Sequence, residues 1–398
     1  MDNEKDLQRS AQWDVAMEAV YLISCALHDR VPDVSEDLES LFHYCQSHSV
    51  AAMVAMALES GWRTNPPKNG DIVTPWKQVK EKAIRKNILL NAERQRILAY
   101  LDSIGCWYLP LKGSFLQHDY PKFGMRQMSD NDILYDVAMD QQVRGFMVES
   151  GYTVKAFGKN NHDEYTKPPV YNFEMHRRLF SPLTHPALAE YYSGIRHLMV
   201  KDADNRCGYH LSDEDFYVYM IAHAYKHYFV RGTGIRTLVD VYVFLDRHGE
   251  KLDWTYVETE IKKLGITDYE RQCRSIAPKL FDLPCRDIPL SEAEAVFLEQ
   301  FLGAGTYGSR KQAVENALDR MQANDASGGF LTKMRYFWQR MFPPLEFMAE
   351  LEPDLLEHRW KLPFAYLKRL LKVLFLYPMR AIREMQHLIQ AKTNRKKK

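Results

Sequence analysis

The fold is decided by the stretch LPLKGSFLQHDYPKFGMRQMSDNDILY, residues 109–135. It opens on a short apolar run that stops at Lys112-Gly113, which predicts a strand running into a turn. Residues 114–118 then predict a short helix, and residues 133–135 predict a second strand. Because short strands and a helix follow one another within a single stretch, we expect a small sheet built around it.

Outside this stretch, strand and helix patterns continue to alternate up to residue 185. The regions before and after it have the three-to-four residue spacing of amphipathic helices, with three to five helices expected before residue 105. The predicted fold class is therefore α+β, a small mixed-sheet core flanked by N-terminal and C-terminal helical regions. The expected regions are helical residues 1–104, the α+β core 105–185, a helical domain 186–326 and a helical segment with a basic tail, 327–398.

Two acidic residues begin the second strand of the quoted stretch. If Asp130 starts the strand, Asp130 and Asp132 project from the same face, since side chains alternate along a strand. Carboxylates this close repel one another unless a cation lies between them, and a Mg²⁺ ion with substrate phosphates would supply that cation. Glu174, between apolar neighbours, is a candidate third ligand from a neighbouring strand.

The chain holds two other Asp-x-Asp triplets, at residues 202–204 and 213–215. Both lie in polar stretches beside predicted helix starts, where we interpret them as turn and cap residues. Only the first triplet follows an apolar strand that ends in Gly113-Ser114. Backbone N–H groups and a hydroxyl at the start of a helix accommodate phosphate oxygens well. The first triplet is therefore the candidate site.

These motifs resemble the signature of the nucleotidyltransferase superfamily, which is Gly-Gly or Gly-Ser, then Asp-x-Asp or Asp-x-Glu, then a third acidic residue on a later strand. The chain is more closely similar to a bacterial group of uncharacterised nucleotidyltransferase-like proteins, over about residues 85–280. That group typically reads Leu-Lys-Gly-Ala, Tyr-Pro, Arg-Pro-Met-Gly-Asp-Ile-Asp-Leu-Leu and, later, Asp/Glu-x-His-Trp-x-Leu. Asn131 departs from this pattern, because an apolar residue usually separates the two acids, and we expect it to weaken packing there without changing the ligands.

The resemblance implies an activity and a set of site residues. Asp130, Asp132 and Glu174 would hold two Mg²⁺ (or Mn²⁺) ions, which polarise the α-phosphate of a nucleoside triphosphate such as ATP and activate an acceptor hydroxyl. A nucleoside monophosphate would pass to that hydroxyl, on a small molecule, sugar or protein, with release of pyrophosphate. The residues expected to bind the nucleotide are Lys112, Gly113, Ser114 and Arg126, with the two cations neutralising phosphate charge.

Further polar residues are candidates for accessory or acceptor-binding roles, each with a plainer alternative. His176 either tunes Glu174, acts as a base, or is a hydrogen-bonded structural histidine. His223 and His227 are four residues apart, as in zinc-binding helices, yet they also suit packing or contact with the acceptor. Arg236 and Asp240, also four apart, form either a helix-surface ion pair or part of the cleft.

The net charge of +1, from 53 Lys and Arg against 52 Asp and Glu, hides a segregation. Residues 359–398 hold 12 basic residues and one acidic one, so this tail carries +11 and the rest of the chain −10. An apolar stripe lies among the basic residues of the tail: Leu367, Leu370, Leu371, Leu374 and Phe375. Such a segment docks on the acidic body or a partner, lies on anionic lipid, or binds RNA.

The charged N-terminus predicts no secretory signal, and no stretch is apolar enough to predict a membrane span. We therefore expect a cytoplasmic protein, with the tail as the one feature able to bring it to the inner face of a membrane. The six scattered cysteines fit reduced thiols. Two alternatives to an enzyme remain: a catalytically silent protein that binds a nucleotide or partner, and a membrane- or RNA-associated scaffold. The intact acidic triad favours the enzyme.

Overall fold

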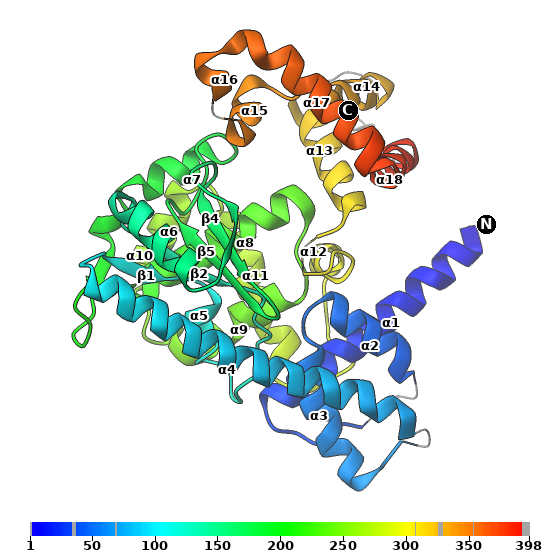
Figure 1. Cartoon of the computed structure of the whole chain (residues 1–398). Helices are drawn as coiled ribbons and strands as arrows, with labels where there is room; N and C mark the ends of the chain where they lie inside the picture. Colours follow the sequence, from blue (N-terminus) through cyan, green and yellow to red (C-terminus); the bar gives the residue numbers. More distant parts are fainter. Residues whose placement is uncertain are drawn as a thin grey trace.

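A computed structural model describes residues 2–33, 37–67, 70–306, 308–324, 329–352 and 354–391 (Figure 1). The N-terminal region is helical, as predicted. Its elements are α1 (Asp2–Leu27), α2 (Leu38–Ser47), α3 (Ala51–Thr64), the 3-10 turn η1 (Gly70–Ile72) and α4 (Val73–Ser103).

The core that follows alternates strands and helices, which confirms the predicted α+β class. Its elements are β1 (Tyr108–Pro110), α5 (Gly113–Leu116), β2 (Asn131–Tyr135), η2 (Val137–Met139), α6 (Asp140–Glu149), β3 (Thr153–Ala156), β4 (His162–Lys167) and β5 (Tyr171–His176). The strands form one mixed sheet in the order β1-β2-β5-β4-β3. The β2–β5 pair is parallel, while the other neighbouring pairs are antiparallel.

The two faces of this sheet bury different chemistry. Ile133 and Tyr135 of β2, with Phe173 and Met175 of β5, pack into a hydrophobic cluster with α4 and α6. Because side chains alternate along a strand, the residues between them project from the opposite face. That opposite face carries Asp132 and the two β5 residues Glu174 and His176.

Asn131 faces α4 and is fully buried. Its Oδ1 accepts a hydrogen bond from Arg94 Nη1 at 2.8 Å, and its Nδ2 donates to the carbonyl of Leu90 at 3.3 Å. Satisfied hydrogen bonds largely offset the cost of burying an amide. The packing loss expected from this departure is therefore compensated by polar contacts with α4.

The rest of the chain is mainly helical. Its elements are α7 (Pro186–Tyr191), η3 (Tyr192–His197), β6 (Met199–Lys201), β7 (Tyr209–Leu211), α8 (Asp213–Arg231), α9 (Arg236–His248), α10 (Trp254–Lys263), α11 (Thr267–Phe281), α12 (Glu292–Leu302), α13 (Arg310–Asn324), α14 (Gly329–Met341), α15 (Leu345–Leu351), α16 (Asp354–Glu357), η4 (Arg359–Lys361), α17 (Leu362–Leu376) and α18 (Pro378–Gln390). Helices α8, α9 and α11 share one hydrophobic cluster with α1–α3. The expected boundary at 326/327 lies outside the described residues.

The second half of the chain positions α8 and α9 against the polar face of the sheet. Ser212 caps α8, with its hydroxyl accepting from the Asp215 backbone N–H at 3.1 Å. Figure 1 shows α13 leading from the body to α14–α18, which gather at the far end from α3. Among the described residues, no helix combines the length and apolarity that a membrane span requires.

Candidate functional site

The acidic residues meet on two adjacent parallel strands. Asp132 of β2 is in direct register with Glu174 of β5, so their carboxylates leave the same face of the sheet side by side. Asp130 lies one residue before β2 rather than beginning it. Burial, together with repulsion from Asp132, raises the pKa of Asp130. The three acids thus crowd negative charge onto one wall, which we call the sheet wall.

Asp132 is the most tightly bonded of the three. Its Oδ1 accepts from Lys112 Nζ at 2.7 Å and lies 2.8 Å from His176 Nε2. Burial opposes its ionisation, but Lys112 and His176 together hold the pKa of Asp132 well below its usual range. Burial likewise disfavours the imidazolium of His176, yet its hydrogen bonds to Asp132 and Glu174 raise the pKa of this histidine. Both contacts use Oδ1, which leaves Oδ2 for another cation.

The turn between β1 and α5 sets the position of Lys112. This lysine has a φ of 50°, in the left-handed region that L residues rarely adopt. Gly113 follows it, and a Cβ there would collide with the guanidinium of Arg126 and the side chain of Met128. Glycine is therefore needed at 113 for close packing by Arg126. Helix α5 itself has only four residues, Gly113–Leu116.

Ser114 points away from the acidic residues. Its buried hydroxyl donates to the carbonyl of Leu111 at 2.6 Å, and the residue lines a different, smaller cavity together with Arg94 and Tyr108. The Gly-Ser motif thus provides a glycine to the candidate site and a local hydrogen bond to the turn.

Arg126 joins the sheet region to α9. Its Nε and Nη2 donate to the two carboxylate oxygens of Asp240 at 2.8 and 2.9 Å, and Tyr120 donates to the same carboxylate at 2.7 Å. Asp240 therefore pairs with Arg126, 114 residues away in sequence, while Arg236 donates to the carbonyl of Gln127 at 3.1 Å. Burial opposes both charges of this pair, but Arg126 holds the pKa of Asp240 below its usual range.

Helices α8 and α9 present basic and hydroxyl groups opposite the acids, and we call this the helix wall. His223 and His227 lie with their Nε2 atoms 3.2 Å apart. One nitrogen of such a pair must be an unprotonated acceptor, so at least one ring is neutral. Burial, followed by the charge of Lys112, lowers the pKa of His223. Lys226, between them, has its pKa lowered to about 8, chiefly by burial.

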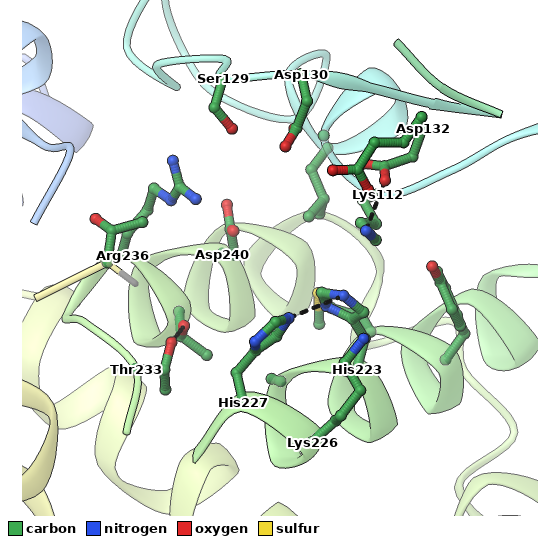
Figure 2. A pocket seen from close by; sticks show the side chains of 18 of the residues that line it. Lys112, Ser129, Asp130, Asp132, His223, Lys226, His227, Thr233, Arg236 and Asp240 are labelled. Carbon is green, nitrogen blue, oxygen red and sulfur yellow. Dashed lines mark hydrogen bonds and ion pairs between the residues drawn. The ribbon is translucent and has the colours of Figure 1, made fainter. Parts of the chain in front are cut away.

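The two walls enclose one cleft of about 540 Å³, a size typical of ligand-binding pockets. Figure 2 shows Asp130, Asp132 and Lys112 on one side, and His223, Lys226 and His227 on the other. With the exception of Ser114, every predicted site residue lines this cleft: Lys112, Gly113, Arg126, Asp130, Asp132, Glu174, His176, His223, His227, Arg236 and Asp240.

Several residues that line the cleft were not predicted from the sequence, among them the ionisable residues His162 and Lys226. His162 of β4 lies opposite His176 of β5 in the antiparallel register. Among the described residues, His162, Glu174 and His176 form a group whose potential metal-ligand atoms all lie within 4.8 Å of one another. His162 reaches the cleft only because β4 pairs with β5. The residues around His162 in the sequence therefore could not predict its place in the cleft. Lys226 could have been predicted from the sequence, because it lies three residues after His223 on the same predicted helix.

The fold and cleft define an α+β protein in which two carboxylates, on adjacent parallel strands, line a polar cavity. A family model described as "Uncharacterised nucleotidyltransferase" matches residues 35–282, more than half of the chain. The chain therefore belongs to this uncharacterised nucleotidyltransferase family. Comparison with curated proteins and with solved structures gives no match.

Proposed function

We propose that the protein is a divalent-metal-dependent nucleotidyltransferase. It transfers a nucleoside monophosphate from a nucleoside triphosphate to a hydroxyl acceptor: the new bond joins the acceptor oxygen to the α-phosphorus, the bond to the β-phosphate oxygen breaks, and pyrophosphate leaves. The observation that carries the proposal is the register of Asp132 beside Glu174, with Asp130 next to them, on one wall of a ligand-sized cleft. Membership of the family supports it.

The donor chemistry of the sheet wall fits a divalent cation. Asp130, Asp132 and Glu174 offer the carboxylate oxygens that Mg²⁺ and Mn²⁺ prefer. Burial, followed by repulsion from Asp132, raises the pKa of Asp130, and a bound cation would offset that repulsion. When bound, the ion would polarise the phosphate and lower the pKa of the acceptor hydroxyl. Asp132 retains Lys112 and His176 on Oδ1, which orients its carboxylate for this role.

The cations of the cleft divide into paired and unpaired groups. Lys112 is bonded to Asp132 and Arg126 to Asp240, so each already neutralises a carboxylate. Lys226 contacts the ring of Phe180 at 5.7 Å and has no carboxylate within ion-pair distance among the described residues. We therefore assign the substrate phosphates chiefly to Lys226, with Lys112 at the edge of the metal site. The neutral His223–His227 pair is suited to accept a hydrogen bond from the acceptor hydroxyl.

The Lys112–Asp132 ion pair also favours a second candidate, a nucleotide-binding protein without transferase activity. A lysine that neutralises a metal-binding aspartate reduces the charge available to a cation. In this alternative the cleft binds a nucleoside triphosphate through the same residues but leaves it intact.

One experiment separates the two candidates. The protein is incubated with each α-labelled nucleoside triphosphate and Mg²⁺ or Mn²⁺, together with a metabolite and protein extract, and label transfer is followed. The proposal predicts transfer that Asp132→Asn lowers by about 100-fold or more, since metal binding supplies several kcal/mol to the transition state. The matched control is Asp204→Asn, in the exposed turn of another Asp-x-Asp triplet, which should leave transfer unchanged.

Transfer that Asp132→Asn does not alter would contradict the metal assignment. Binding of the nucleotide without transfer to any acceptor in the extract would favour the second candidate.

A further inference from the structure

Large apolar side chains of α17 are exposed to solvent. The exposed fractions are 65% for Phe364, 54% for Leu367, 44% for Leu371, 65% for Leu374 and 79% for Phe375. Phe364, Leu367, Leu371 and Leu374 recur every three or four positions and Phe375 lies four after Leu371, so the five residues share one face of the helix. An exposed apolar face of this extent on a soluble domain indicates an interaction surface. We call these five residues the α17 stripe.

The opposite face of α17 fixes the helix with its stripe outward. Ala365 is buried in a small cluster with Met348 and Leu355. Tyr366 donates to the carbonyl of Pro343 at 2.6 Å, and Arg369 donates to the carbonyl of Arg340 at 3.1 Å. These contacts hold this face of α17 against α14, α15 and α16, so the α17 stripe points outward.

Helix α18 packs on another helix of the same chain, whereas the α17 stripe is exposed in the described structure. Leu388 and Ala391 pack with Val314 and Leu318 of α13 in a separate small cluster. One alternative left open by the sequence, docking of the tail on its own chain, therefore describes α18. In the part of the chain that the structure describes, the α17 stripe stays exposed.

Charge identifies the kind of partner. The described tail, residues 359–391, holds seven basic residues against one acidic residue, Glu384, and Glu384 is already bonded to Arg340. Lys372 is exposed beside Leu371, and Trp360 is 68% exposed one turn before Phe364. An apolar stripe with lysine beside it and tryptophan at its end is typical of helices that lie in the interface of an anionic bilayer.

Two other occupants fit less well. RNA is bound by aromatic stacking and phosphate contacts, whereas Leu367, Leu371 and Leu374 make the middle of the stripe aliphatic. A second copy packed stripe to stripe would bring two basic segments of like charge together.

We propose that α17 binds the surface of an anionic phospholipid bilayer. Phe364, Leu367 and Leu371 enter the apolar layer, and Lys372 lies among the headgroups. This surface is separate from the cleft, so the proposal does not depend on the chemistry assigned there.

The test is flotation of the full chain with vesicles of phosphatidylglycerol mixed with phosphatidylcholine, and with vesicles of phosphatidylcholine alone. The protein should float with the anionic vesicles only. Leu367→Glu combined with Leu371→Glu should lower the bound fraction by roughly 10-fold or more, because both side chains are expected in the apolar layer. The matched control is Ile88→Glu with Val148→Glu, similarly exposed on α4 and α6 at 56% and 49%, which should float like the unmodified protein.

Three outcomes would overturn the proposal. The unmodified protein could remain at the bottom with anionic vesicles, or the Leu367→Glu, Leu371→Glu variant could float as well as the control pair. Light scattering without lipid could also find a dimer that the same variant converts to monomers, which would assign the stripe to a second copy. Circular dichroism of each variant verifies that it is folded.

Discussion

The two walls of the cleft differ in how their charged side chains are paired. On the sheet wall, Asp132 is bonded to Lys112 and His176, and the strands set it in register beside Glu174. On the helix wall, Lys226 faces the cleft without a carboxylate partner among the described residues, and burial lowers its pKa to about 8. A prearranged acidic wall suits a cation, and a basic wall lacking its counter-charge suits an anionic substrate. Under the proposed function, the sheet wall would hold the metal ion and the helix wall would bind the substrate phosphates.

Removal of the Arg126–Asp240 ion pair, which joins the two walls, should have the largest effect. Arg126→Met removes one member of the buried Arg126–Asp240 pair and leaves Asp240 charged without its partner. We expect a loss of about 3–5 kcal/mol in the free energy of unfolding, measured by denaturant titration. Tyr120→Phe is the control, since it removes one hydrogen bond to the same carboxylate and should cost about 1 kcal/mol. Equal losses in the two variants would show that the pair does not hold the walls together.

The next largest effect is expected from a substitution on the sheet wall alone. Glu174→Gln keeps the shape of the side chain but removes a charge from the proposed metal site. We expect kcat for label transfer to fall by roughly 100-fold, with a much smaller change in KM. A change confined to KM would place Glu174 in substrate binding and not in metal chemistry.

A smaller effect is expected from the helix wall. Lys226→Met removes a cleft cation that has no carboxylate within ion-pair distance among the described residues, and it should weaken binding of inorganic tripolyphosphate by roughly 10-fold, from the loss of one charge-assisted contact. Isothermal titration calorimetry supplies the affinity. Lys122→Met, which removes an exposed lysine of the loop before β2, is the control. If both variants bind tripolyphosphate like the unmodified protein, the phosphates are held elsewhere.

The smallest effect is a pH dependence of that binding. Burial, followed by repulsion from Lys112, lowers the pKa of Lys226 to about 8. The ammonium is therefore charged below pH 8 and becomes neutral as the pH rises through 8, so tripolyphosphate should bind a few-fold more weakly above that value. Lys226→Arg stays charged throughout and should lose this step. Identical pH profiles for the two proteins would assign the step to another group.

Local patterns predicted the fold class and most of the candidate residues that the structure brings together in the cleft. The strand and helix periods around residues 109–135 indicated the sheet, and the side-chain alternation at Asp130 and Asp132 indicated the acidic wall. Long-range pairing was not readable. For Arg236 and Asp240 the sequence allowed either an ion pair with each other or a place in the cleft; both line the cleft, and Asp240 binds Arg126. His162 reaches the cleft only through the pairing of β4 with β5. Contacts of this kind depend on tertiary packing, which no local spacing encodes.

Ser114 shows a different limit of prediction from sequence, which is the backbone conformation of a turn. A Gly-Ser pair after a strand predicts a phosphate contact only if the turn presents the hydroxyl to the cleft. Here Lys112 adopts a positive φ, and the Ser114 hydroxyl closes back onto Leu111. The backbone conformation of a lysine was not predictable from its residue type, since L residues rarely enter that region.

The most direct test of the assignment of the sheet wall to a metal ion is a measurement of Mn²⁺ binding. Electron paramagnetic resonance in the presence of ATP measures this binding. The account predicts that the protein binds Mn²⁺ and that Asp130→Asn weakens this binding by roughly 10-fold or more, since it removes one carboxylate ligand. Asp204→Asn should bind like the unmodified protein. Equal Mn²⁺ affinity in all three proteins would contradict the assignment of the acidic wall to a metal ion.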